Sequence, residues 1–379
     1  MIMTMILSAS GCSTDETVKE NAMDLCNPSI RAYLNAETEE EQAAILEQCD
    51  GMRLSFQDLS FMWDRDESTK TYKVSFADNQ EYQDARVYET VVANVDPDGV
   101  FVPGRTYYWK VESVDTGKVL KEGSFTTTDA PVRFITTKQV HNVRDLGGWK
   151  TEDGKTVKYE LLYRGGITNP YEGNNFPEED QILFRDVLGI KSEIDLRTPA
   201  ADDRNQTVSI LGEDAPYYKT PIQGYCYIIP GFRQSEPFSR ANSSSINQSI
   251  KEIFHVLADE NNYPIYFHCN AGADRTGTIA YLINGVLGVS YEDLTRDFEL
   301  TSFSPGGRRW RGEITGGSFD SRGVMQDDEE NYVAWGKMNQ MMKAKYGGGS
   351  LSETIANYLM KACQVPQEDI DNLRRIMLE

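Results

Sequence analysis

The segment 263–287 constrains the fold most, because a buried strand, a short loop and a buried helix are predicted there in direct succession. Residues 263–267, Tyr-Pro-Ile-Tyr-Phe, are aromatic, β-branched and apolar, as expected of a strand, and residues 278–287 have the apolar composition of a buried helix. The loop between them begins His-Cys-Asn-Ala-Gly. We therefore expect Cys269 on a strand-to-helix loop.

Such a loop is suited to an anion. Its backbone N–H groups can converge on a phosphate, and the helix N-terminus adds partial positive charge. The same field favours an ionised, nucleophilic Cys269, and Arg275, five residues further along, offers a planar fork to two phosphate oxygens. The predicted phosphate-binding residues are Asn270, Ala271, Gly272, Ala273, Asp274 and Arg275, and the predicted catalytic residues are Cys269, Arg275, Asp274 and Thr276.

The loop and three further segments carry a family resemblance. Residues 142–148 read Asn-Val-Arg-Asp-Leu-Gly-Gly, and related segments follow at 161–166 and 194–197. Together they resemble the bacterial tyrosine-protein phosphatase family, whose loops read HCxxGKDRTG, over about residues 132–379. The resemblance implies an α/β domain with a central sheet flanked by helices. It also implies a cysteine-dependent phosphomonoesterase that forms a cysteinyl-phosphate.

The general acid is left open among three carboxylates. Dephosphorylation needs an acid to protonate the leaving oxygen and then, as a base, to activate water. The resemblance puts Asp274 first, and the alternatives are Asp214 and Glu236. Two charged pairs at predicted strands are interpreted as structural ion-pair formers rather than catalysts: Asp195 with Arg197, and Arg144 with Asp145.

One departure from the family loop concerns the substrate. The family loop reads Gly-Lys-Asp-Arg, and its lysine is associated with inositol phosphates. This chain has Ala273 in place of that lysine. An arginine-rich insert follows, and it either supplies a basic pocket wall or is a solvated loop. Its substrate-binding candidates are Arg308, Arg309 and Arg311.

Composition limits the partners. The formal net charge of −21 argues against nucleic acid and against general attraction to anionic membranes. No cofactor or metal is expected, because the cysteine carries the chemistry. Residues 1–7 are apolar and lead through small residues to Cys12, which resembles a lipobox whose cysteine is acylated. We expect an exported protein, anchored by lipid in a bacterial envelope, either periplasmic or at the surface.

Three regions are predicted along the chain. Residues 1–50 are interpreted as a truncated signal and a polar helical tether, in which one disulfide could join Cys26 to Cys49. Residues 51–130 show short alternating strands with Trp63 and a Tyr-Tyr-Trp run, similar to a fibronectin type III-like β-sandwich whose aromatics form the core. Residues 131–379 form the phosphatase-like domain.

The substrate expected first is phosphotyrosine in a protein, or a small phosphate ester, with dual specificity allowed. An inositol phosphate or phosphoinositide is the first alternative. The second is a non-catalytic, phosphate-binding surface module in which the sandwich is the functional part. The oligomeric state is left open.

Overall fold

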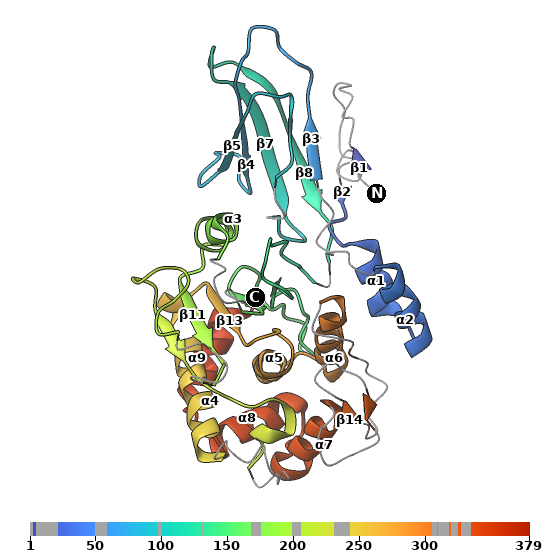
Figure 1. Cartoon of the computed structure of the whole chain (residues 1–379), viewed down its shortest axis with the longest axis vertical. Coiled ribbons are helices and arrows are strands. Elements are labelled where there is room, and N and C mark those ends of the chain that lie inside the picture. Colours follow the sequence, from blue (N-terminus) through green and yellow to red (C-terminus); the bar gives the residue numbers. More distant parts are fainter. Residues whose placement is uncertain are drawn as a thin grey trace. The chain divides into compact units, whose positions relative to one another are not determined.

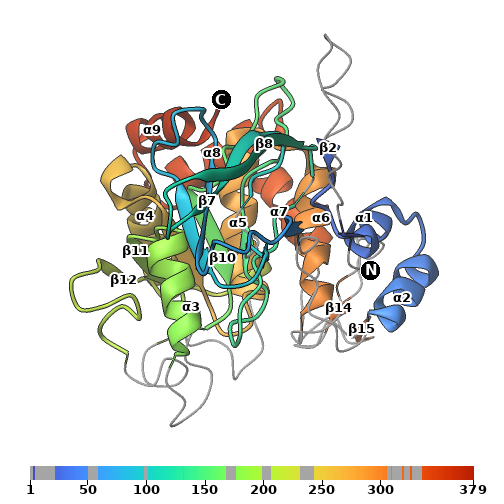
Figure 2. The same cartoon turned by 90° about the horizontal axis from the view of Figure 1, so that it is seen from above.

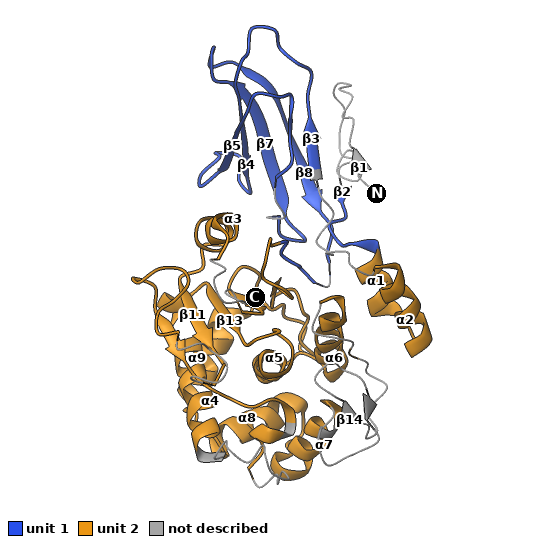
Figure 3. Cartoon of the chain, in the orientation of Figure 1, with its two compact units in different colours: residues 1–28, 55–136 blue, residues 29–54, 137–379 orange. Residues whose placement is uncertain are grey.

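The computed structural model divides into two compact units, residues 1–28 and 55–136 (unit 1) and residues 29–54 and 137–379 (unit 2), coloured separately in Figure 3. The two units therefore alternate along the sequence, each being made of two segments. The structure describes residues 3–4, 22–49, 59–97, 101–130, 132–167, 176–198, 206–230, 243–304, 309, 318–319, 325–326 and 335–379.

Unit 1 is built on two sheets (Figure 1). One has the order β2-β8-β7-β4-β5 and the other the order β1-β3-β6. Their strands are β1 (Met3–Thr4), β2 (Ala22–Met23), β3 (Leu59–Met62), β4 (Tyr72–Ala77), β5 (Arg86–Thr90), β6 (Asn94–Val95), β7 (Thr106–Ser113) and β8 (Val119–Thr127).

Aromatic side chains fill the interior of unit 1. Phe61 of β3 packs edge-on against Phe76 of β4, with ring centroids 4.8 Å apart. Phe101 packs in the same way against Phe125 of β8 at 5.1 Å. All four rings are buried, as is Trp109, so these aromatics form a core, as their alternation in the sequence predicts.

Unit 2 contains a sheet of order β12-β11-β13-β10-β9. Strand β9 is antiparallel to β10, and the other neighbours are parallel. The strands are β9 (Arg144–Asp145), β10 (Leu162–Gly165), β11 (Ser192–Asp195), β12 (Tyr217–Lys219) and β13 (Ile265–His268), and a separate hairpin pairs β14 (Ser318–Phe319) with β15 (Met325–Gln326). Because β13 is central, the end of this strand is enclosed by neighbours on both sides.

Helices complete the α/β architecture of unit 2. Helix α5 packs against β10 and β13, and Figure 2 shows it running alongside β10. The α-helices are α1 (Pro28–Asn35), α2 (Glu39–Gln48), α3 (Glu178–Ile182), α4 (Ser243–Leu257), α5 (Asp274–Leu287), α6 (Tyr291–Glu299), α7 (Trp335–Tyr346), α8 (Leu351–Lys361) and α9 (Gln367–Met377). The shorter helical turns are η1 (Leu183–Val187), η2 (Tyr225–Ile228), η3 (Glu260–Asn262) and η4 (Leu300–Phe303).

The helical tether expected in residues 1–50 is present as α1 and α2, but residues 29–48 belong to unit 2 instead of forming a separate tether. Ile30, Tyr33 and Leu34 are buried, and the ring of Tyr33 packs edge-on against Phe303 at 4.8 Å. Helix α2 begins with a complete capping box between Thr38 and Glu41. Apolar residues on one helical face thus dock a segment whose acidic composition suggested solvation alone.

No disulfide joins Cys26 to Cys49 in the structure, and both side chains are buried thiols. Cys12 lies outside the described residues. Within the part of the chain that is described, no helix is both long enough and apolar enough to cross a bilayer.

Candidate active site

The predicted strand, loop and helix are present. Strand β13 ends at His268 and helix α5 begins at Asp274, so the loop that carries Cys269 follows the carboxyl end of the central strand. The Cys269 side chain is a buried thiol. The N-cap residue Ala273 has no side-chain group to cap the first turn of α5, so this turn can offer its N–H groups to an anion.

Gly272 fits where no other residue would. Its φ is +65°, and a Cβ there would lie 2.4 Å from the carbonyl carbon of Gly165. Its carbonyl oxygen accepts hydrogen bonds from Asn142 Nδ2 at 2.9 Å and from an Arg164 terminal nitrogen at 2.8 Å. A trans peptide directs its N–H opposite to its C=O. The N–H of Ala273 therefore points away from these buried donors.

A buried ion cluster lies behind the loop. Asp297 of α6 is bound by Arg144 of β9, with the Nε–Oδ1 distance at 2.9 Å, and by Arg164 of β10 through its other oxygen. Burial opposes ionisation of Asp297, but Arg144 and Arg164 outweigh it and hold its pKa below the usual range. Burial and the nearby Arg164 lower the pKa of Arg144 to about 10, so it stays charged at neutral pH. The cluster fixes the donor that binds Gly272.

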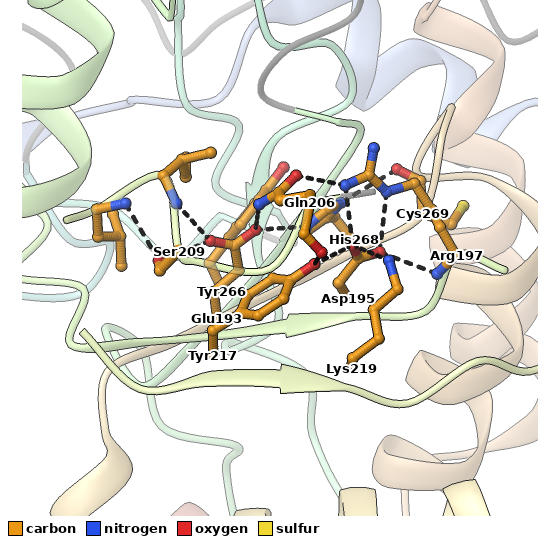
Figure 4. Close-up of polar contacts among 12 residues, drawn as sticks. Glu193, Asp195, Arg197, Gln206, Ser209, Tyr217, Lys219, Tyr266, His268 and Cys269 are labelled. Atoms are coloured by element: carbon orange, nitrogen blue, oxygen red, sulfur yellow. Dashed lines mark hydrogen bonds and ion pairs between the residues drawn. The ribbon is translucent and has the colours of Figure 1, made fainter. Parts of the chain in front are cut away.

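His268, directly before the cysteine, is held by Glu193 of β11 (Figure 4). Its Nε2 lies 2.9 Å from Glu193 Oε1, and its Nδ1 lies 3.2 Å from the carbonyl oxygen of Cys269. These two contacts fix the orientation of the imidazole ring beside the loop.

A second buried cluster lies at the carboxyl end of β11, beside His268 (Figure 4). Asp195 accepts hydrogen bonds from Arg197, Lys219 and Tyr217. Burial opposes ionisation of Asp195, but His268, Arg197 and Lys219 outweigh it and keep its pKa far below the usual range. Asp195 and Arg197 thus form the expected ion pair. Arg144 pairs with Asp297 instead of its sequence neighbour, and Asp145 accepts from the backbone N–H of Gly147.

Asp274, the first candidate for the general acid, begins helix α5 beside Arg275. Its Oδ1 accepts hydrogen bonds from the Tyr225 hydroxyl at 2.5 Å and from a terminal nitrogen of Arg309 at 2.9 Å. The Asp274 side chain is 34% exposed, so it can reach a bound ligand. Cys269 thus lies on the loop, and Asp274, Arg275 and Thr276 lie in the first turn of α5 directly after it.

The other acid candidates lie elsewhere. Asp214 is exposed and precedes the amino end of β12, whereas Cys269 follows the carboxyl end of the parallel β13. The two residues are thus at opposite edges of the sheet, which argues against Asp214 as the acid. Glu236 lies outside the described residues.

The environment of Arg309 differs from the predicted one. It was expected to line a basic pocket or to be solvated, but its side chain is 1% exposed and is bound to Asp274. Arg308 and Arg311 lie outside the described residues.

The residues at the site that were not predicted from the sequence include Glu193, Tyr225 and Asp297. Asp297 had a weak signal, because it lies three residues after Leu294 and next to Phe298 on the apolar face of α6. A carboxylate on an apolar stripe needs a buried partner. Glu193 and Tyr225 had no comparable signal, and their partners His268 and Asp274 lie 75 and 49 positions away.

The chain belongs to the tyrosine phosphatase family, whose sequence pattern matches residues 135–379. A Cupriavidus necator protein provisionally named a tyrosine-protein phosphatase is 26% identical over 170 residues, which cover 42% of this chain and 59% of that protein. A Nostoc commune protein named tyrosine-protein phosphatase is 28% identical over 124 residues, or 31% of this chain and 42% of that protein. The chain thus spans about half the length of these relatives.

Two further matches have other names. A protein of Arabidopsis thaliana named inositol diphosphatase is 25% identical over 134 residues, which cover 30% of this chain and 52% of that protein. Among solved structures, the core catalytic domain of a PP-IP phosphatase from S. cerevisiae in complex with citrate matches at 18% identity. That match has a TM-score of 0.27 and covers 39% of this chain and 73% of that one, so the similarity is too low to support a functional assignment.

Proposed function

We propose that the chain is a cysteine-dependent phosphomonoesterase that hydrolyses phosphotyrosine, with dual specificity allowed. The observation that carries the proposal is the loop itself. Cys269 follows the central strand, the Gly272 carbonyl is held by buried donors, and Arg275 lies in the first turn of α5. Membership of the tyrosine phosphatase family supports the same reaction.

The reaction has two steps. The Cys269 thiolate attacks phosphorus, the phosphorus–oxygen ester bond breaks, and Asp274 gives its proton to the leaving oxygen. Asp274 then takes a proton from water as the water oxygen attacks phosphorus and the sulfur leaves. Arg275 binds the equatorial oxygens most strongly when their charge increases in the transition state. This chemistry uses no metal or cofactor.

Thr276 fits the second step. Its side chain is fully buried, and its Oγ1 hydrogen-bonds to no group among the described residues. Such a hydroxyl is costly unless it gains a partner during the reaction. We assign the Cys269 thiolate as that partner, since a hydrogen bond to sulfur would ease its departure.

The main test is Cys269→Ser. Turnover of p-nitrophenyl phosphate in EDTA is expected to vanish while phosphate still binds, because the backbone donors remain and no base is present to ionise a serine. Vanadate should inhibit turnover by the wild-type enzyme in the same assay. Steady-state turnover by Cys269→Ser would contradict the mechanism. If the wild-type protein binds phosphate but does not hydrolyse phosphate esters, the non-catalytic surface module is favoured instead.

An inositol phosphate is the second candidate substrate, favoured by the relative named inositol diphosphatase. Ala273 opposes it, because the family lysine is absent there. Ala273→Lys is expected to raise the ratio of kcat/KM for inositol polyphosphates over phosphotyrosine peptides by about tenfold or more, the effect of one charge-assisted hydrogen bond. An unchanged ratio would mean that position 273 does not select the substrate. A preference of the unchanged enzyme for inositol phosphates would reverse the ranking.

For unit 1 we propose a fibronectin type III-like role in binding a surface partner. Its two sheets and its aromatic core support the resemblance. Expression of residues 22–28 joined to 55–136 by a short glycine-serine linker, followed by denaturant unfolding, tests whether this unit folds independently, with β2 kept in its sheet. A noncooperative transition would contradict an independent module.

We further propose export and lipid anchoring through Cys12. The apolar residues 1–7 and the small residues before Cys12 support this. Metabolic labelling with a fatty acid, compared between the unchanged chain and Cys12→Ala, tests it. Equal labelling of the two would contradict the anchor.

A further inference from the structure

The contact between Arg309 and Asp274 lies at the start of the phosphate loop helix. Arg309 belongs to an insert far from the loop in sequence, yet its terminal nitrogen lies 2.9 Å from Asp274 Oδ1. The arginine side chain is 1% exposed. A guanidinium buried this completely requires a partner, because removing its hydration is costly. Asp274 supplies that partner.

Asp274 accepts hydrogen bonds from two side chains, and both of these side chains pack against the ring of Phe298. The Tyr225 hydroxyl lies 2.5 Å from the same Oδ1. The ring of Phe298 in α6 packs edge-on against Tyr225 at 6.1 Å, and the Arg309 guanidinium lies 6.0 Å from the same ring. Two fixed donors on one oxygen restrict rotation of the carboxyl group. They hold it in one orientation relative to Arg275 and the loop.

The backbone of Arg309 is itself anchored. Its N–H donates to Ser302 Oγ at 2.7 Å, and its carbonyl oxygen accepts from the Tyr33 hydroxyl at 3.0 Å. Tyr33 lies on α1, and Gln42 of α2 donates to the Tyr33 carbonyl at 3.3 Å. The helix pair α1 and α2 is therefore connected to Asp274 through one residue.

We propose that Arg309 is a positioning residue for Asp274, and that Tyr33 of the N-terminal helix pair holds Arg309 in place. The proposal rests on the proposed function, since it gives Asp274 the role of acid and base. It makes the helix pair a part of the active site, although unit 1 separates it in sequence from the rest of unit 2. A purely structural ion pair would stabilise the fold without any effect specific to proton transfer.

The test is a double-mutant cycle of Arg309→Gln and Asp274→Asn, measured as kcat/KM on two aryl phosphates. Phenyl phosphate has a poor leaving group that needs the proton, whereas p-nitrophenyl phosphate hardly needs it. Arg309→Gln is expected to lower kcat/KM about tenfold or more for phenyl phosphate and less than about threefold for p-nitrophenyl phosphate. In the Asp274→Asn background it should cause little further loss.

Conservative and control variants complete the experiment. Arg309→Lys keeps the charge and should recover part of the loss on phenyl phosphate. Tyr33→Phe keeps the ring beside Phe303 and removes the hydroxyl, so it should cause a smaller loss with the same substrate dependence. The matched controls are Arg375→Gln, whose ion pair with Glu260 is exposed, and Tyr263→Phe, whose buried hydroxyl donates to Leu257.

Equal losses on both substrates, or additive losses in the cycle, would overturn the proposal. If Arg309→Gln fails to fold, Tyr33→Phe decides the outcome by the same substrate dependence. Failure of the proposed function is distinguishable, because turnover would then persist in Cys269→Ser. An additive cycle together with inactive Cys269→Ser would refute the positioning role alone.

Discussion

In unit 1 the space between the sheets is filled by aromatic rings, whereas in unit 2 charged side chains lie under the phosphate loop. Phe61, Phe101 and Phe125 contact one another in unit 1. Arg144, Arg164 and Asp297 are equally buried in unit 2. The aromatic core needs only volume and apolar surface. The charged layer fixes the directions of individual carbonyl groups, which packing alone does not specify.

The largest expected effect comes from breaking the charged layer. Asp297→Asn leaves two buried guanidinium groups without a counter-charge and is expected to destabilise unit 2 by roughly 3–5 kcal/mol. kcat/KM for p-nitrophenyl phosphate should fall roughly a hundredfold as the Gly272 carbonyl loses its fixed donor. Denaturant unfolding and the phosphatase assay measure these effects.

The control for that substitution is Asp371→Asn, since Asp371 forms an exposed pair with Arg374 at 3.5 Å. It is expected to change stability by less than about 1 kcal/mol. A loss in Asp297→Asn no greater than in this control would show that the buried cluster does not support the loop.

A substitution in the aromatic core of unit 1 should cause a smaller loss of stability and no loss of activity. Phe125→Leu is expected to destabilise unit 1 by roughly 1–2 kcal/mol and to leave kcat/KM unchanged, because the reacting groups all lie in unit 2. Differential scanning calorimetry and the phosphatase assay test both parts. A loss of activity in fully folded Phe125→Leu would mean that the two interiors are not independent in function.

The smallest effect is the dependence of stability on pH. The folded pKa values of Asp297 and Asp195 are depressed, so their contribution is fully present above the unfolded value of about 3.9. It is lost as pH falls further through the folded values. We expect the unfolding free energy of unit 2 to decline below about pH 4, and less steeply in Asp297→Asn. Identical slopes in the two proteins would contradict a coupling between this carboxylate and folding.

Unit 1 provides the contrast in the same titration. Hydrogen bonds from Ser68 lower the pKa of Asp66, and backbone hydrogen bonds from Lys70 and Thr71 lower that of Asp115. Both carboxylates are at the surface, where water screens such interactions. The acid-dependent loss should therefore be steeper in unit 2 than in unit 1.

Several elements could be predicted from local sequence. The spacing of Ser350 and Glu353 is that of a capping box, which begins α8, and the amphipathic run before Leu257 forms α4. The apolar spacing over residues 178–188 is that of one helix, but the segment begins as α3 and continues as a π-helical turn, a difference in hydrogen bonding that the spacing does not resolve. The helical character of α1 and α2 was expected, but their packing into unit 2 was not, because the acidic composition of the segment suggested solvation.

The sequence by itself determined the phosphate loop. The strand, Cys269, Gly272, Arg275 and the following helix are contiguous, so local geometry and helix polarity dictate their arrangement. Only the tertiary structure decided the surroundings. Asp297 meets Arg144 across 153 positions, and Tyr33 meets Arg309 across 276. Such pairs depend on which faces of strands and helices come together when the whole chain packs. A short sequence pattern cannot predict them, because the partners are far apart in the sequence.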